Sequence, residues 1–148
     1  MKKLACLIFT VSLITSAFAA TVGFIDVEQV FKSYSKTKVA QEEINNKMKD
    51  YKKLVSQYQQ KLEDAKIDGK TDKDIEKIKA DMQKELDPKE TEIKMLNEEK
   101  MAKIRKEIVS AVDSVAKEIG IDVVVDKQVV ITGGNDLTEM TIEKLNKK

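Results

Sequence analysis

The side chains that most often carry enzyme chemistry are scarce in this chain of 148 residues. It contains no His and a single Cys, at position 6. His is the commonest general base and metal ligand, and it is the usual partner of a serine or cysteine nucleophile. The serines beyond residue 19 therefore have no His to activate them: Ser33, Ser35, Ser56, Ser110 and Ser114. The sequence predicts no catalytic residue, no metal ligand and no cofactor site, and hence a protein that is not an enzyme.

The charged residues have the distribution of solvated helix surfaces. Lys and Arg number 27 and Asp and Glu 26, so the net charge is +1. This balance argues against a nucleic-acid partner, which usually requires a strongly basic face. Charged residues make up 36% of the chain and aromatic residues 5%, which is typical of long exposed helices rather than of a thick core.

The first nineteen residues predict an export signal. Lys2 and Lys3 precede an apolar run from Leu4 to Ile14, and residues 17–19 (Ala-Phe-Ala) match a signal-peptidase site. The apolar run is too short and too rich in hydroxyl groups to favour a membrane anchor. We therefore expect residues 1–19 to be a signal peptide that is cleaved after Ala19 when the protein is exported.

Without this segment, the chain has little apolar material with which to stabilise a monomer. Residues 20–148 carry a net charge of −1, five aromatic side chains and no Cys. Disulfides are therefore excluded, although exported proteins usually reach an oxidising compartment. Because so polar a chain buries little apolar area against its conformational entropy, we expect it to assemble with other copies.

The elements that follow are dominated by a helical hairpin. From about Lys36 to Ile67 the chain lacks Gly and Pro, and its apolar residues alternate at intervals of four and three, which predicts a helix with one apolar seam. Gly69 indicates a break, and a second helical pattern then runs to Ile119. We predict an arm over residues 36–119 with its tip near 68–71. The seam of its first helix is Ile44, Met48, Tyr51, Val55, Tyr58, Leu62 and Ala65.

Pro88 interrupts the second helical pattern. In a continuous helix it would remove a backbone hydrogen bond and cause a kink. Alternatively, Asp87 acts as the N-cap of a new helix, with Pro88 as its first residue and Glu90 in a capping-box arrangement. Either interpretation makes Pro88 a point of articulation, which is either a hinge or a rigid bend.

Short β-branched segments on both sides of the arm predict strands. They cover residues 22–27, 121–126 and 129–132, and a turn at 133–135 leads to a closing helix with Thr138 as its expected N-cap. We predict an α+β fold in which residues 20–35 and 120–148 form a small β-rich body. Its core, shared between copies, is expected to contain Phe24, Ile25, Val123, Val125, Val130 and Ile131.

Three of these segments resemble the Skp/OmpH family of periplasmic chaperones. They are residues 22–26 (Val-Gly-Phe-Ile-Asp), 121–126 (Ile-Asp-Val-Val-Val-Asp) and 136–138 (Asp-Leu-Thr), and the arm matches in pattern and length. The resemblance covers essentially all of the chain after residue 19. It implies a homotrimer with a shared β-barrel and three helical arms. It further implies that unfolded outer-membrane proteins are held between the arms, without ATP, and are kept from aggregating.

Two features of the arm bear on this implied function. Met95 neighbours the seam residue Leu96 and is a candidate client contact, because Met side chains adapt to varied apolar partners. The charge departs from the strongly basic arms expected from the family, since residues 32–118 carry 21 basic and 19 acidic side chains. We therefore carry over no residues for binding membrane lipid or lipopolysaccharide. The densest basic cluster, Lys103, Arg105 and Lys106, is interpreted as a solvated helix face.

An alternative function uses the same elements. The chain would be an exported structural coiled coil or envelope-assembly adaptor that binds no client. The strands favour the chaperone, because a helical arm does not need them, whereas several arms sharing one base do.

Overall fold

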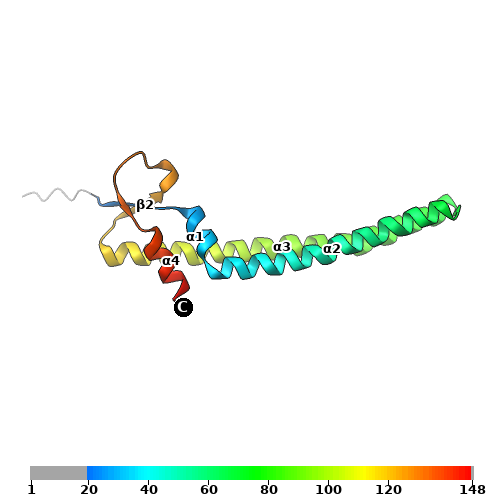
Figure 1. The fold of residues 1–148 in the computed structure, drawn as a ribbon, viewed down its shortest axis with the longest axis horizontal. Helices are drawn as coiled ribbons and strands as arrows, with labels where there is room; N and C mark the ends of the chain where they lie inside the picture. Colours follow the sequence, from blue (N-terminus) through cyan, green and yellow to red (C-terminus); the bar gives the residue numbers. More distant parts are fainter. Residues whose placement is uncertain (1–19, 148) are drawn as a thin grey trace, which may run out of the picture.

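A pair of long antiparallel helices projects from a small body, as Figure 1 shows. The computed structural model describes residues 20–147, so the expected signal peptide lies outside the described residues. The helices are α1 (Val27–Ser33), α2 (Ser35–Ile67), α3 (Asp72–Ile119) and α4 (Thr138–Asn146), with a 3₁₀ turn over Lys127–Val129. The strands are β1 (Val22–Ile25), β2 (Val123–Asp126) and β3 (Asn135–Asp136). The fold is mostly helical, with a small parallel sheet.

The turn at the tip of the arm follows from local chemistry. Gly69 adopts a φ of 66°, a left-handed conformation that favours Gly. Thr71 is the N-cap of α3, and its side chain accepts a hydrogen bond from the Asp74 backbone N–H at 3.3 Å. The Asp74 carboxylate in turn accepts one from the Thr71 N–H, which completes a capping box. A helix of 33 residues therefore reverses directly into one of 48 residues.

Helix α3 continues without interruption through Pro88. The interpretation in which Asp87 begins a new helix is therefore wrong. The Thr91 hydroxyl donates a hydrogen bond to the Asp87 carbonyl at 2.9 Å. On either side of the proline, Leu86 and Ile93 are buried and hold α3 in place. Packing of these two side chains offsets the one backbone hydrogen bond that Pro88 cannot make. Whether the arm flexes here stays a prediction.

The sheet is built from both ends of the chain. Strand β1 lies in the centre and pairs in parallel with β2 on one side and β3 on the other. Val22 is opposite Val123 and Phe24 is opposite Val125, while Phe24 is also opposite Asp136 on the other side. Parallel neighbours need a crossover connection, and the whole helical arm lies within the one between β1 and β2.

The predicted strand at residues 129–132 is wrong. The Asp126 carboxylate accepts a hydrogen bond from the Gln128 N–H at 3.0 Å, which turns the chain into the 3₁₀ segment immediately after β2. The third strand is instead Asn135–Asp136, part of which falls in the predicted turn. Its polar sequence lacks the β-branched signal, and it pairs because Gly133 and Gly134, both at positive φ, bring it beside β1.

Residues 136–138 join the end of the chain to its beginning. The side chain of Leu137 is fully buried, and its N–H donates to the Phe24 carbonyl at 2.9 Å. The Thr138 hydroxyl accepts a hydrogen bond from the Asp26 N–H at 2.9 Å. Thr138 is thus the first residue of α4, not its N-cap as predicted, because its hydroxyl is directed towards β1.

The short helix α1 was not identified from the sequence. Its signal is Asp26, whose carboxylate accepts a hydrogen bond from the Gln29 N–H at 2.9 Å and caps the helix. The same contact, ahead of the ion pair with Lys127, lowers the pKa of Asp26. Helix α1 places Val30 at full burial against the body.

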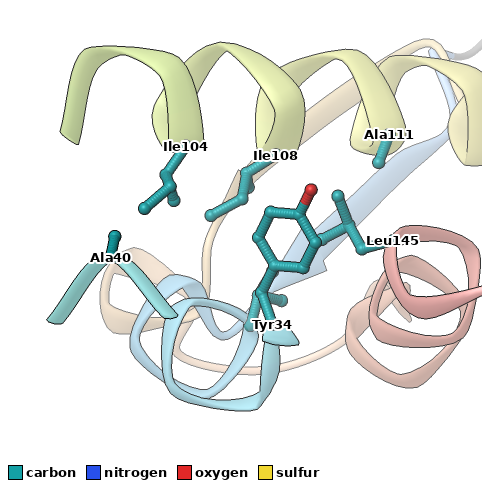
Figure 2. Close-up of a cluster of buried hydrophobic side chains, with 7 residues drawn as sticks. Tyr34, Ala40, Ile104, Ile108, Ala111 and Leu145 are labelled. Carbon is teal, nitrogen blue, oxygen red and sulfur yellow. The ribbon is translucent and has the colours of Figure 1, made fainter. Parts of the chain in front are cut away.

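Tyr34 forms the corner between α1 and α2. Its extended backbone, with φ −74° and ψ 122°, ends one helix and begins the next. The Asn146 side chain of α4 clamps this corner, accepting a hydrogen bond from the Ser35 N–H at 2.9 Å and donating one to the Ser33 carbonyl at 3.0 Å. Figure 2 shows the Tyr34 ring enclosed by its apolar neighbours, namely Ala40, Ile104, Ile108, Ala111 and Leu145.

Gly23 of β1 lies where the two ends of the chain pack closely against each other. A Cβ at this position would lie 2.5 Å from Leu137 Cδ1 and 3.2 Å from the Asn135 carbonyl oxygen. We expect Gly23→Ala to lower the free energy of unfolding by about 1–3 kcal/mol through overpacking. Urea unfolding followed by circular dichroism measures this loss. Val39→Ala, at an exposed position of α2, is the control. Equal stability of the two variants would contradict the close packing.

Candidate functional site: the arm and the groove at its base

An apolar groove lies where the arm meets the body, and we call it the basal groove. It has a volume of about 650 Å³ and lies between α1, α3 and β2. Its polar edge is formed by Glu28, Arg105, Asp126 and Gln128. Its apolar lining is Ile25, Val27, Phe31, Met101, Ile108, Val109, Val112, Val124 and Val125.

Several apolar side chains of the basal groove remain uncovered in the single chain. Val109 is 61% exposed and Val27 is 40% exposed. A separate exposed set lies on the segment after β2, where Val129 is 71% exposed and Ile131 is 100% exposed. Exposed apolar clusters of this kind mark surfaces that bind another molecule or another copy.

The residues predicted for the shared core are divided between these surfaces. Ile25 is buried and Val125 is half-buried, and both line the basal groove. Phe24 and Val130 are half-buried, whereas Val123 and Ile131 are exposed. The single chain therefore leaves part of this set in contact with solvent.

The residues of the predicted seam lie on α2. Ile44 and Tyr58 are buried, as is Ala65 near the tip. The other four, Met48, Tyr51, Val55 and Leu62, are half-buried. Tyr58 also lies under the Lys61 ammonium, whose Nζ is 4.6 Å from the ring centroid. Burial of the Tyr58 side chain is the main cause that raises the pKa of its phenol.

Ion pairs between α2 and α3 are concentrated in the half of the arm nearer the body. Among the described residues, three such pairs join the helices. Lys47 Nζ lies 2.6 Å from Glu92 Oε1, and Lys100 Nζ lies 2.6 Å from Glu43 Oε2. The third pair joins Lys36 to Glu107 at 2.9 Å. Exposed pairs contribute modestly, so they align the two helices more than they stabilise them.

Glu107 receives hydrogen bonds from two sides at the base of the arm. The Tyr34 hydroxyl donates to its carboxylate from the corner between α1 and α2, and Lys36 donates from α2. These two bonds, the Tyr34 bond first, hold the pKa of Glu107 below its usual range. Burial, followed by the same bond, raises the pKa of Tyr34.

Met95 and Pro88 lie on the same side of α3. Met95 is 64% exposed, whereas its neighbour Leu96 is half-buried. Pro88, Thr91, Glu92, Leu96 and Glu99 complete a shallow depression around it, with a volume of about 630 Å³. The apolar contact that this surface offers comes from Pro88, Met95 and Leu96, and its other three lining residues are polar.

Within residues 20–147 there is no group of three or more acidic, His or Cys side chains that could hold a metal ion. None of the helices in this same span is long and apolar enough to cross a membrane.

This combination defines a class of protein with a helical arm on a small strand-bearing base. The model of the family described as Outer membrane protein (OmpH-like) matches residues 21–145, which is most of the chain. The chain belongs to the OmpH-like family, as the resemblance in its sequence predicted. This family consists of non-enzymatic periplasmic proteins with a chaperone-type role. Among curated proteins, none is similar enough to the chain to match it.

The contacts of Glu107 lead to a prediction about pH. Its lowered pKa means that the ionised carboxylate stabilises the fold above the pKa of the unfolded chain. This contribution is lost as the pH falls through the lowered folded-state pKa. We expect Glu107→Gln to reduce the free energy of unfolding by about 1 kcal/mol at neutral pH, and the difference from wild type to narrow in acid.

Urea unfolding over a series of pH values measures this difference. Glu63→Gln, which alters an exposed carboxylate on the arm, is the control and is expected to match wild type throughout. A difference between wild type and Glu107→Gln that stays constant from neutral to strongly acidic pH would contradict the role of the charge.

Proposed function

We propose that this protein is a periplasmic holdase that acts as a homotrimer and needs no ATP. It holds unfolded outer-membrane proteins in the cavity between three helical arms and prevents their aggregation. The observation that carries the proposal is the arm itself. Helices α2 and α3 pack on each other through one seam and extend away from the body, so both outer sides of the arm are free to contact a client (Figure 1). The proposal agrees with membership of the OmpH-like family.

The uncovered surfaces of the body support the homotrimer. The basal groove lies against α1 and α3, whereas Val129 and Ile131 project from a different segment. Contact between two unlike patches of the same chain is heterologous and closes into a ring when the rotation permits. The outer edges of β2 and β3 are also unpaired within the described chain, and open edges favour pairing with another copy. The proposed interface contains Phe24, Ile25, Val123, Val125, Val130 and Ile131.

The arm suits weak and adaptable binding of unfolded chains. A holdase carries out no reaction, and it needs an accessible surface that tolerates many sequences. Met95 provides an exposed thioether chain that can repack against different apolar clients. Because the arm is near neutral, we expect apolar contact rather than long-range charge attraction to dominate capture. Pro88, beside this surface, is the proposed hinge.

The experiment that tests this function is analytical sedimentation of the chain lacking residues 1–19. It is run alone and mixed with a urea-unfolded outer-membrane barrel protein. We expect the mass of three chains, and with client the mass of three chains plus one client, without aggregate. A trimer that lets the client precipitate would instead identify the structural adaptor, and a stable monomer would contradict both the shared core and the cavity.

Val125→Asp tests the proposed interface. The substitution introduces a carboxylate into an apolar contact, and an unpaired buried charge is strongly unfavourable. We expect the native mass to fall from three chains to one while circular dichroism still reports the helical arm. Val39→Asp, the same change at an exposed position of α2, is expected to leave the mass unaltered. A trimeric Val125→Asp variant would exclude this residue from the interface.

Met95→Ser tests the proposed client contact. Loss of one partly covered thioether chain is expected to weaken client binding about two- to threefold, since only a fraction of its apolar area is buried in a mobile complex. Light scattering from a client diluted out of urea, at increasing chaperone concentrations, measures the shift. Val39→Ser removes an equally exposed apolar side chain from α2. A client affinity of Met95→Ser equal to that of wild type would remove Met95 from the contact surface.

A further inference from the structure

Thr21, the residue that precedes β1, is fastened to the segment before β2 by three hydrogen bonds. Its carbonyl accepts from the Asp122 N–H at 3.0 Å and from the Val123 N–H at 3.2 Å. Its own N–H donates to Asp122 Oδ2 at 2.8 Å. These bonds extend the pairing in which Val22 lies opposite Val123, and Figure 1 shows the blue start of the described chain beside β2. Because Thr21 is fixed in this way, the preceding residue, Ala20, must lie close to Asp122.

The Asp122 carboxylate can accept more than it receives from Thr21. A carboxylate has about four acceptor positions, and the Thr21 N–H occupies one of them. Within residues 20–147, Asp122 has no ion-pair partner. Asp26, just beyond the other end of β1, instead pairs with Lys127 at 3.5 Å. A paired carboxylate thus lies at one end of β1, and a carboxylate that can still bind a cation lies beside the other.

Cleavage after Ala19 would supply a cation at this end. Hydrolysis of the peptide bond between residues 19 and 20 consumes one water and leaves a carboxylate on residue 19 and an amine on Ala20. The amine takes up a proton below about pH 8, so it is an α-ammonium group at neutral pH. Before cleavage, the same nitrogen is an uncharged amide that carries one proton. The charge at this position therefore depends on processing.

Covalent geometry places the new ammonium group within reach of Asp122. Three bonds separate the nitrogens of Ala20 and Thr21, so these atoms are at most about 3.7 Å apart. Since Thr21 N lies 2.8 Å from Asp122 Oδ2, the Ala20 nitrogen lies within about 6.5 Å of that oxygen. Ala20 is exposed and belongs to no helix or strand, so rotation about its ψ can shorten this distance. Successive backbone nitrogens converge on one anion in this way at many anion sites.

We propose that Asp122 binds the α-ammonium group that signal-peptide cleavage creates on Ala20. The ion pair closes the pairing of β1 with β2 at the end where the described chain begins, and it forms only in the processed protein. Full stability of the body therefore follows the removal of residues 1–19. The inference rests on the proposed periplasmic function only through this cleavage, and it is independent of client binding and of the trimer.

Asp122→Asn separates the charge of this side chain from its hydrogen bond. An Asn side chain still accepts from the Thr21 N–H, but it cannot neutralise an ammonium group. Nα-acetylation of the chain that begins at Ala20 removes the other charge and alters no side chain. Together the two changes form a double-mutant cycle that isolates the ion pair.

Urea unfolding of the four proteins measures this cycle, at one protein concentration because assembly also stabilises the fold. Acetylation of the wild type is expected to raise the unfolding equilibrium constant about two- to fivefold, as loss of an exposed ion pair does. Acetylation of Asp122→Asn is expected to have no effect. Asp64→Asn, at an exposed position of α2, is the control, and acetylation is expected to affect it as it affects the wild type.

Hydrogen exchange locates the effect within the structure. The N–H groups of Asp122 and Val123 donate to Thr21, so their exchange reports opening at this end of the strand pair. Acetylation is expected to accelerate their exchange about two- to fivefold in the wild type and not in Asp122→Asn. A Ser-Gly extension before Ala20 keeps an α-ammonium group but moves it about 7 Å along the chain, and it is expected to act like acetylation.

Equal effects of acetylation in the wild type and in Asp122→Asn would overturn the proposal, as would no effect in the wild type. Mass spectrometry of the exported chain identifies its first residue, and a first residue other than Ala20 would also overturn it. The sedimentation test with a client does not depend on any of these results. Failure of the ion pair and failure of the holdase are therefore distinguishable.

Discussion

The structure depends on the parallel pairing of β1 with strands that come from the opposite end of the chain. Parallel neighbours cannot be joined by a tight turn, so the chain must leave the end of β1 and return to the beginning of β2. It does so through α2 and α3, and the return helix is the longer one, with 48 residues against 33. The extra length of α3 lies beneath α1 and α4, where Ile104, Ile108 and Ala111 bury the corner at Tyr34. The arm is therefore part of the connection between two paired strands of the body.

Contacts at the Tyr34 corner fix the direction in which the arm leaves the body. The ring is buried, its hydroxyl donates to Glu107 of α3, and the Asn146 amide of α4 holds the backbone on both sides of it. Residues of α3 and α4 thus meet at the corner between α1 and α2. A body of few and short strands can orient a long arm because these contacts are directional as well as apolar. Towards the tip, side-chain packing replaces ion pairs as the link between the helices, since the described ion pairs between them lie nearer the body.

The same geometry separates three surfaces around the base of the arm. Successive positions on α3 face the basal groove, the buried core and a second concave surface that Lys36 and Lys144 also line, because a helix turns by about 100° per residue. Arg105, Ile104 and Lys106 are close in sequence yet lie on these three different surfaces. One helix therefore presents the body, the groove and a third surface with different side chains. The surface around Met95, proposed for client contact, lies on α3 farther towards the tip of the arm.

The sequence by itself determined the elements whose cause is local. The heptad spacing of Ile44 to Ala65, the break at Gly69 and the end of α3 at Ile119 all follow from neighbours within a few residues. The OmpH-like segments were visible in the same way. The tertiary structure decided what depends on distant partners. Asn135–Asp136 is a strand only because β1 lies beside it, Thr138 fails to cap α4 because its hydroxyl accepts from Asp26, and Pro88 stays within a helix because buried neighbours hold it there. The basal groove could not be predicted either, since its lining comes from α1, α3 and two strands that are far apart in the sequence. Local propensities are of the order of 1 kcal/mol, and contacts between remote segments outweigh them wherever packing or a hydrogen bond favours another conformation.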